Sequence, residues 1–201
     1  PFYSQVKRIK DDKTMQETGT RINKYMSQCG YCSRREADRL IEKGEVWING
    51  TLATMGTKVM PGDTVMVHHT TITPCQKEYL LAFHKPAGIV CTTSKIDKNN
   101  VIDYLNFPER IYPVGRLDKE STGLLLLTNN GQLMDDILRG SNYHEKEYIV
   151  HVNKPITDSV LQAMAQGVPI LDTITRPCKI RRMGKDCFYI TLTQGLNRQI
   201  R

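Results

Sequence analysis

The sequence predicts an α+β fold in which short strands outnumber helices and form mainly antiparallel sheets flanked by helices. Two observations lead to this prediction. Most apolar segments are only four to eight residues long, and short turns rich in Gly, Pro, Asn and Asp separate them. Strands joined by such short turns pair antiparallel, because a parallel connection needs a long crossover. At 201 residues the chain has room for one large domain or two modest ones.

The first expected unit, residues 20–67, begins with two helices. Apolar residues at helical spacing predict a helix over 22–29 that ends at Gly30. Ser33 and Glu36 have the spacing of a capping box, so a second helix should start there and end at Gly44.

Short strands complete this unit. Asn49-Gly50 predicts a tight hairpin turn between two of them, and a further turn over 61–63 precedes a strand over 64–67. Residues 1–19 show no periodicity and are expected to form a flexible lead-in. Residues 68–78 are rich in Thr and are expected to form a linker.

The second expected domain covers residues 79–201. Its strands are predicted over 79–84, 89–93, 111–114, 124–127, 146–152, 168–174, 178–182 and 187–193. Its helices are predicted after Asn99 or Asn100, from Asn130-Gly131 to Gly140, and from Thr157 to Gly167. The chain stops at Arg201 without a cap or polar tail, and we expect this domain to be incomplete at its carboxyl end.

The charge of the chain favours a nucleic acid as partner. The net charge is +7 and the isoelectric point is about 9.1, which suits a polyanion. The sequence contains neither a stretch of 18 apolar residues nor a basic amphipathic segment, so it gives no indication of a membrane partner. The six cysteines are expected to be free thiols in a reducing cytosol. Cys29 and Cys32 lack a second close pair, so no metal site is expected.

Basic side chains gather on the two helices of the first unit. These residues are Arg21, Lys24, Arg34, Arg35 and Arg39. Acidic residues on the second helix dilute the charge, so an ordinary solvated helix face is an equal alternative. The run from Arg21 to Gly50, including Cys32-Ser-Arg-Arg-Glu-Ala37, resembles the S4 RNA-binding domain. That resemblance implies a module that grips structured RNA through its backbone and shape.

Three polar sites in the second domain are candidates for chemistry. Asp118 lies in a glycine-bounded turn between two apolar runs, Tyr148 lies in an alternating strand, and a basic turn over 195–201 ends in Arg201. Each has an ordinary alternative: a turn aspartate bonding its own backbone, a core tyrosine and a surface arginine. Together, a carboxylate, a phenol and a guanidinium could share one cleft.

The second domain resembles the RNA pseudouridine synthases, in the branch with an amino-terminal S4 domain. The matching motifs are Lys85-Pro86-x-Gly88, Gly115-Arg116-Leu117-Asp118, Glu147-Tyr148, and Gly195 with Gln199-Ile200-Arg201. Segments around His144 and Gly167 are most similar to the synthase F type, which modifies a stem-loop of large-subunit ribosomal RNA.

The resemblance implies the isomerisation of uridine to pseudouridine without a cofactor. Asp118 would act as nucleophile at C1′ or as base at C2′, with Arg201 as its ion-pair partner and Tyr148 stacked on the flipped uracil. Arg116, Gln199 and Ile200 would bind the substrate. Lys85 and Gly88 would support the floor of the cleft.

Two other functions remain open from the sequence. A catalytically dead RNA-binding or ribosome-assembly protein would need neither Asp118 nor Tyr148, and an RNA glycosidase would need a second acid to activate water. The expected partner is ribosomal RNA, with a tRNA stem-loop as a further substrate, and no membrane. A cytoplasmic monomer is expected, and the truncated chain should bind RNA but turn over poorly.

Overall fold

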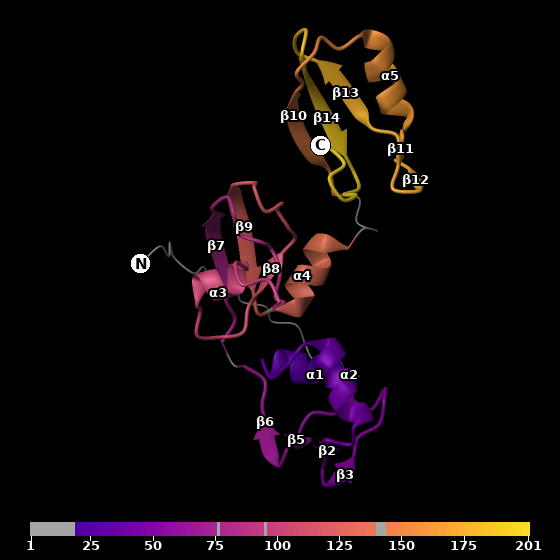
Figure 1. The fold of residues 1–201 in the computed structure, drawn as a ribbon. Helices are drawn as coiled ribbons and strands as arrows, with labels where there is room; N and C mark the ends of the chain where they lie inside the picture. The colour runs from indigo at the N-terminus through magenta and orange to yellow at the C-terminus, as the bar shows by residue number, and fades with distance from the viewer. Residues whose placement is uncertain (1–18, 76, 95, 140–143) are drawn as a thin grey trace. The chain divides into compact units, whose positions relative to one another are not determined.

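The computed structural model describes residues 19–75, 77–94, 96–139 and 144–201. The chain divides into two compact units, one reaching to Met134 and the other running from Asp135 to Arg201. Each unit is described by itself (Figure 1). The expected lead-in, apart from Gly19, and the predicted helix end at Gly140 lie outside the described residues.

The first part of unit 1 contains two helices and a small antiparallel sheet. The helices are α1 (Ile22–Gln28) and α2 (Arg34–Glu42). The strands are β1 (Thr20–Arg21), β2 (Val46–Ile48), β3 (Thr51–Leu52), β4 (Lys58–Val59), β5 (Val65–Val67) and β6 (Thr70–Ile72). Strands in the order β3-β2-β5-β6 form one sheet, and β1 pairs with β4. The inner faces of helices and sheet form one core that includes Met26, Ala37 and Val65.

The local signals in this part are confirmed. The Ser33 hydroxyl accepts a hydrogen bond from the Glu36 N–H at 3.2 Å, which caps α2. Gly44 has a positive φ of 73° just beyond the end of α2. Asn49 and Gly50 have φ angles of 50° and 80°, as a tight hairpin between β2 and β3 requires.

The expected linker 68–78 is wrong in its first half, because β6 lies there and pairs with β5. Its Ile72 is buried in the core of the first part. The turn that joins β5 to β6 consists of His68 and His69, with φ angles of 47° and 65°. Gly, Asn and Asp are the usual residues at such positions, so a His-His pair gives no turn signal in the sequence.

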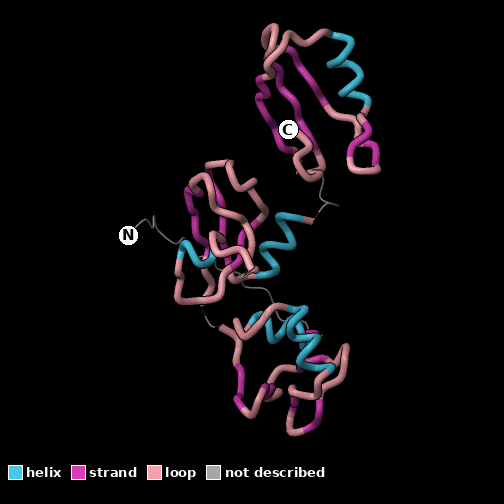
Figure 2. Tube along the Cα trace, viewed as in Figure 1, coloured by secondary structure: helices cyan, strands magenta, loops and turns pink. Residues whose placement is uncertain are grey.

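A second sheet of unit 1 carries the Asp118 turn. It consists of β7 (Leu80–Lys85), β9 (Gly123–Thr128) and β8 (Tyr112–Val114) in the order β7-β9-β8, with antiparallel pairing. Helix α3 (Val101–Leu105) precedes β8 in the chain, and α4 (Gly131–Leu138) follows β9 and crosses the boundary between the two units (Figure 2). Leu125 and Leu127 of β9 are buried in its core, as expected for the leucine run.

The predicted strand over 89–93 is wrong. Within the described residues only Val90 makes a β-bridge there, to Asn100. The Val90 N–H donates to the Asn99 carbonyl at 2.9 Å and its carbonyl accepts from the Val101 N–H at 3.0 Å. These bonds end at the start of α3, where the Asn100 side chain caps the helix, so no partner strand continues the ladder.

Unit 2 is a three-stranded antiparallel sheet with one helix. The sheet order is β10 (Lys146–His151), β14 (Cys187–Leu192) and β13 (Lys179–Arg182). The helix is α5 (Asp158–Gln166). The predicted strand 168–174 is instead a small hairpin of β11 (Pro169–Ile170) and β12 (Thr173–Ile174). All named strand pairs among the described residues are antiparallel, and the α+β class is confirmed.

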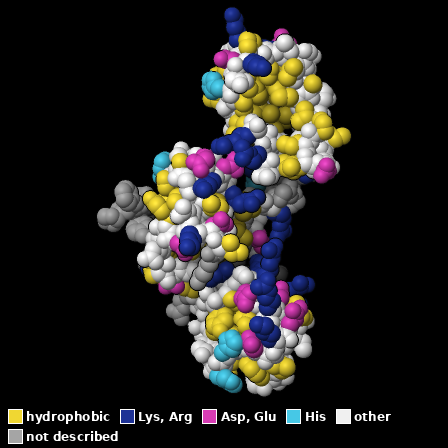
Figure 3. Space-filling view, in the orientation of Figure 1, with side chains coloured by type: hydrophobic (Ala, Val, Ile, Leu, Met, Phe, Trp, Pro, Cys, Tyr) yellow, Lys and Arg dark blue, Asp and Glu magenta, His cyan; other side chains and the backbone are white. Residues whose placement is uncertain are grey.

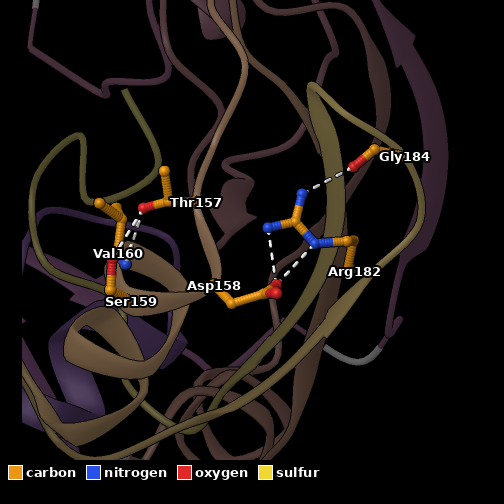
Figure 4. Close-up of polar contacts among 6 residues, drawn as sticks. All are labelled: Thr157, Asp158, Ser159, Val160, Arg182 and Gly184. Carbon is orange, nitrogen blue, oxygen red and sulfur yellow. Dashed lines mark hydrogen bonds and ion pairs between the residues drawn. The ribbon is translucent and has the colours of Figure 1, made fainter.

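Polar contacts attach the start of α5 to β13 (Figure 4). The Thr157 hydroxyl accepts from the Val160 N–H at 3.4 Å and caps the helix. Arg182 contacts the Asp158 carboxylate through Nε at 2.8 Å and Nη2 at 2.7 Å, and its Nη1 donates to the Gly184 carbonyl at 3.1 Å. Among the described residues, no helix is long and apolar enough to cross a membrane.

Candidate functional site

Asp118 lies in the connection between β8 and β9, as expected. β8 ends at Val114 and β9 begins at Gly123, and the Asp118 side chain is exposed to solvent. The Asp118 carbonyl accepts a hydrogen bond from the Ser121 N–H at 3.0 Å, which closes a turn directly after the aspartate. The carboxylate is therefore presented from a short, closed loop at one end of the sheet.

Lys85, at the end of β7, holds this loop from below. Its side chain is fully buried, with 0% of its surface exposed. The Nζ atom donates to the carbonyls of Pro86 at 2.8 Å, Lys119 at 3.0 Å and Ser121 at 2.7 Å. A buried ammonium is costly unless hydrogen bonds satisfy it, and here its three protons have three acceptors.

Gly88 adds a further bond to the same loop. It has a φ of 85°, which favours glycine, and its N–H donates to the Lys119 carbonyl at 2.8 Å. Lys119 thus has one carbonyl that binds both the Lys85 ammonium and the Gly88 amide. The motif Lys85-Pro86-x-Gly88 fixes the backbone on the carboxyl side of Asp118, which is how a rigid functional carboxylate is built.

Tyr148 lies in β10 opposite Ile190 of β14, and 37% of its surface is exposed. Its neighbours Glu147 and Ile149 lie on the opposite face of the strand, as the alternation predicted. Because Tyr148 is outside the apolar core of unit 2, its ring remains accessible for a stacking contact.

The turn that ends in Arg201 is held by its own hydrogen bonds. Gln199 makes two hydrogen bonds to the backbone of Leu196. The Gln199 side-chain Oε1 accepts from the Leu196 N–H at 3.1 Å, and the Gln199 N–H donates to the Leu196 carbonyl at 3.2 Å. The Arg201 N–H donates to the Arg198 carbonyl at 2.9 Å. Ile200 packs against the unit 2 core. Gln199 and Ile200 thus have structural contacts here, and their substrate contacts remain predictions.

The predicted site residues are divided between the two units. Arg116 and Asp118 belong to unit 1, whereas Tyr148 and the turn from Gln199 to Arg201 belong to unit 2. The meeting of Asp118, Tyr148 and Arg201 in one cleft therefore stays a prediction.

Three of the five predicted RNA-binding residues surround one hollow of about 430 Å³ in the first part of unit 1. Arg21, Lys24 and Arg34 line it together with Lys58, which the sequence analysis did not single out. Arg35 and Arg39 do not line it, and Arg39 pairs with Glu36 at 3.0 Å. Figure 3 shows Lys and Arg side chains gathered in a column over α2.

Lys58 was missed because its position beside the other cations depends on strand pairing. Lys58 lies in β4 directly opposite Arg21 of β1. Each of these strands has only two residues, which is too short for a recognisable period. A lone Lys among polar residues gives no further signal.

Cys29 and Cys32, in the connection between α1 and α2, are protonated thiols. Burial raises the pKa of Cys29 and of Cys32 to about 11. Both sulfurs pack against the core of the first part. In the part of the chain that the structure describes, no group of three or more His, Cys, Asp or Glu side chains could hold a metal ion.

Two family models match successive parts of the chain. Residues 20–65 match the model of the S4 domain, and residues 79–201 match the model of the RNA pseudouridylate synthase family. A solved structure described as a pseudouridylate synthase is similar, with a TM-score of 0.57 and 26% sequence identity, covering 90% of this chain and 80% of that one.

Two relatives are similar over most of the chain. The dual-specificity RNA pseudouridine synthase RluF of Escherichia coli is 52% identical over 187 residues, which are 92% of this chain and 64% of that protein. This chain thus spans less than two thirds of that relative. The ribosomal large subunit pseudouridine synthase B of Bacillus subtilis is 32% identical, over 90% of this chain and 78% of the relative. The chain belongs to the RNA pseudouridylate synthase family, with an S4 domain ahead of the synthase domain.

Proposed function

We propose that the protein to which this chain belongs converts uridine to pseudouridine in structured RNA, with Asp118 as the essential carboxylate. The observation that carries the proposal is the Asp118 loop, in which the buried Lys85 ammonium and the Gly88 amide hold the backbone beside an exposed carboxylate. An exposed turn aspartate with no function needs no such support, since Asp in turns bonds its own backbone.

The reaction needs one carboxylate and no oxidant or phosphate. The bond between C1′ and N1 of the uridine breaks, the uracil turns over, and a bond forms between C1′ and C5. C5 then loses its proton and N1 takes up a proton, so the product is an isomer of the substrate. Asp118 acts either by attacking C1′ or by removing the C2′ proton. Both roles require the ionised carboxylate.

The remaining site residues are proposed to serve that carboxylate and the base. Arg201 keeps Asp118 ionised, because a guanidinium beside a carboxylate favours its charged form. Tyr148 stacks on the uracil, which leaves the RNA helix at a cost of a few kcal/mol. Arg116 fills the space that the base vacates, and Gln199 and Ile200 border the flipped nucleotide.

The proposed substrate is a stem-loop of large-subunit ribosomal RNA, and a tRNA stem-loop is a second one. The name of one relative, which contains "ribosomal large subunit", supports the ribosomal RNA substrate. The word "dual-specificity" in the name of the other supports more than one RNA substrate. The S4 domain supports an RNA substrate in general. A ribosomal RNA substrate would place the protein in the cytoplasm.

The test uses RNA that carries tritium at C5 of its uridines. The protein to which this chain belongs is incubated with this RNA. We expect tritium release without free uracil. Asp118→Asn should reduce release by at least several orders of magnitude, because no other group supplies the carboxylate.

Glu120→Gln is the matched control, since it neutralises another exposed acid in the same turn. It should leave tritium release near the wild-type level. Free uracil in place of retained pseudouridine would identify a glycosidase. Full binding of RNA without any tritium release would leave only an RNA-binding function and reject the proposal.

A further inference from the structure

We infer that the hollow lined by Arg21, Lys24, Arg34 and Lys58 binds a backbone phosphate of the RNA stem, at the end of strand β9 remote from Asp118. This inference rests on the proposed function for the identity of the RNA. It adds a binding residue, Lys58, and a distance that the substrate must span. The hollow is named the phosphate hollow below.

The charges around the phosphate hollow are all of one sign. Its seven lining residues include four cations and no acid. Arg21, Lys24 and Lys58 make no ion pair or hydrogen bond through their side chains with the described residues. Four cations around about 430 Å³ repel one another, and an anion that enters the hollow relieves this repulsion.

Strand pairing brings two of these cations together at an energetic cost. Arg21 and Lys58 are direct cross-strand partners in the β1–β4 pair, and like charges at that position destabilise a sheet. Arg21 also stands at the start of α1, whose first turn holds no acidic residue, and a cation is unfavourable there. Folding alone would not favour these residue types.

The neighbouring hollow is unsuited to a phosphate. Asp63 and Glu78 are among the residues that line it, and the pKa of Asp63 lies below its ordinary value because the Met60 N–H and the Asn49 amide bond its carboxylate. Two acids, one held ionised in this way, repel the RNA backbone. The phosphate contact therefore belongs to the hollow lined by the four cations.

Contacts within unit 1 place the phosphate hollow beside the carboxyl end of β9. Arg34 lines the hollow, and its Nη2 lies 3.8 Å from where a Cβ on Gly131 would be. Gly131 begins α4, three residues after β9 ends at Thr128. The Arg110 guanidinium also donates to the Ser27 hydroxyl at 3.3 Å, which joins α1 to the segment before β8.

Asp118 lies at the other end of the same strand. Thr128 pairs with Leu80 at one end of the β7–β9 ladder, and Gly123 pairs with Lys85 at the other. Lys85 is the residue that binds the Asp118 loop. Six strand residues are separated by five steps of about 3.3 Å, which gives about 17 Å between these ends. A uridine at Asp118 and a phosphate in the hollow lie beside opposite ends of this strand, so the contact falls on the stem.

The first test measures how RNA binding depends on salt. Fluorescence anisotropy with a labelled stem-loop gives the dissociation constant between 50 and about 300 mM KCl. Lys58→Gln should weaken binding for all RNA sequences alike and reduce the slope of log K against log salt by about 0.7 to 0.9, the value for one released counterion. Lys43→Gln is the control, because Lys43 is exposed at the end of α2 and does not line the hollow.

Two outcomes would refute the proposal that the phosphate hollow binds a phosphate. One is an unchanged slope in Lys58→Gln with a wild-type circular dichroism spectrum, and the other is an equal change in Lys43→Gln. Misfolding does not explain the expected result. Lys58 is the cross-strand partner of Arg21, so its replacement by Gln removes a like charge from the pair and should not lower the thermal midpoint. Lys24→Gln gives a second, independent variant.

The second test varies the RNA stem. Stems of about 4, 8 and 12 base pairs carry the same loop. The effect of Lys58→Gln should appear only on the longer stems, because the hollow and Asp118 lie beside opposite ends of a strand about 17 Å long. An equal effect on the shortest stem would disprove the distance. Both tests measure RNA binding and do not depend on turnover. If the protein shows no isomerase activity but Lys58→Gln still changes the salt slope, the proposed function is rejected and the phosphate contact is retained.

Discussion

Replacing Lys85 with Met should loosen the Asp118 loop and reduce turnover. Met matches the length of the lysine stem and removes only the ammonium. The carbonyls of Pro86 and Ser121 lose this donor, whereas the Lys119 carbonyl keeps the Gly88 N–H at 2.8 Å. Each carbonyl left without a donor costs about 1 to 3 kcal/mol.

The net loss of free energy is smaller than the summed cost of leaving the two carbonyls without a donor. The wild-type protein also bears the cost of desolvating a fully buried ammonium, which Met avoids. We therefore expect the loop to lose about 2 to 4 kcal/mol, in the lower part of the range for two carbonyls. That difference corresponds to about a 30-fold to 1,000-fold change in the opening equilibrium.

Native-state hydrogen exchange measures this opening directly. The Gly88 and Ser121 amides both donate within the loop, and their protection should fall by the same factors in Lys85→Met. Lys98→Met is the control, since Lys98 is exposed in a loop of the same unit. Wild-type protection of both amides in Lys85→Met would refute the role given to the ammonium. RNA affinity should stay unchanged while turnover falls.

Three further predictions concern stability. Asn100→Ala removes a side chain that accepts from two N–H groups at 3.0 and 2.9 Å, and should lower the free energy of unfolding by about 2 kcal/mol in urea titration. Gly167→Ala puts a Cβ 2.5 Å from a backbone carbonyl at a φ of 110°, whereas Gly184→Ala meets ordinary space, so only the first should lower the thermal midpoint by several degrees. Folding raises the pKa of Cys29 and Cys32 to about 11. The free energy of unfolding should therefore fall as pH rises from the ordinary thiol range through about 11. A double Ala variant should lose part of this pH dependence, and an unchanged pH profile would contradict the prediction.

Short-range chemistry explains what the sequence could predict. Ser33, Asn100 and Thr157 each cap a helix with their own side chain, because cap preferences depend on a few neighbouring residues. Asn49-Gly50 likewise forms its hairpin. The motif around Asp118 also lies where expected, in a loop between two strands.

The errors involve contacts between residues far apart in the sequence. The β6 strand was missed because a His-His turn precedes it, and the strand over 89–93 was expected although its polar groups bond to the start of α3. Lys58 acquires its role through pairing with Arg21, 37 positions away by their numbers. Lys85 has three acceptors, and two of them are more than 30 residues away in the sequence. The strand and helix periodicities of apolar residues give no information on such contacts.

Two unfavourable charge placements in unit 1 lie at opposite ends of β9. At one end a fully buried ammonium supports the loop of the proposed catalytic carboxylate. At the other, four cations surround one hollow without an acidic neighbour in its lining. Residues chosen for stability alone would place an apolar side chain at the first position and mixed charges at the second. Both placements become favourable when RNA is bound, if the carboxylate meets a ribose and the cations meet a phosphate. The same strand would then set the distance between the reacting nucleotide and the anchored stem, and selection among uridines would depend on the length of stem beyond each loop.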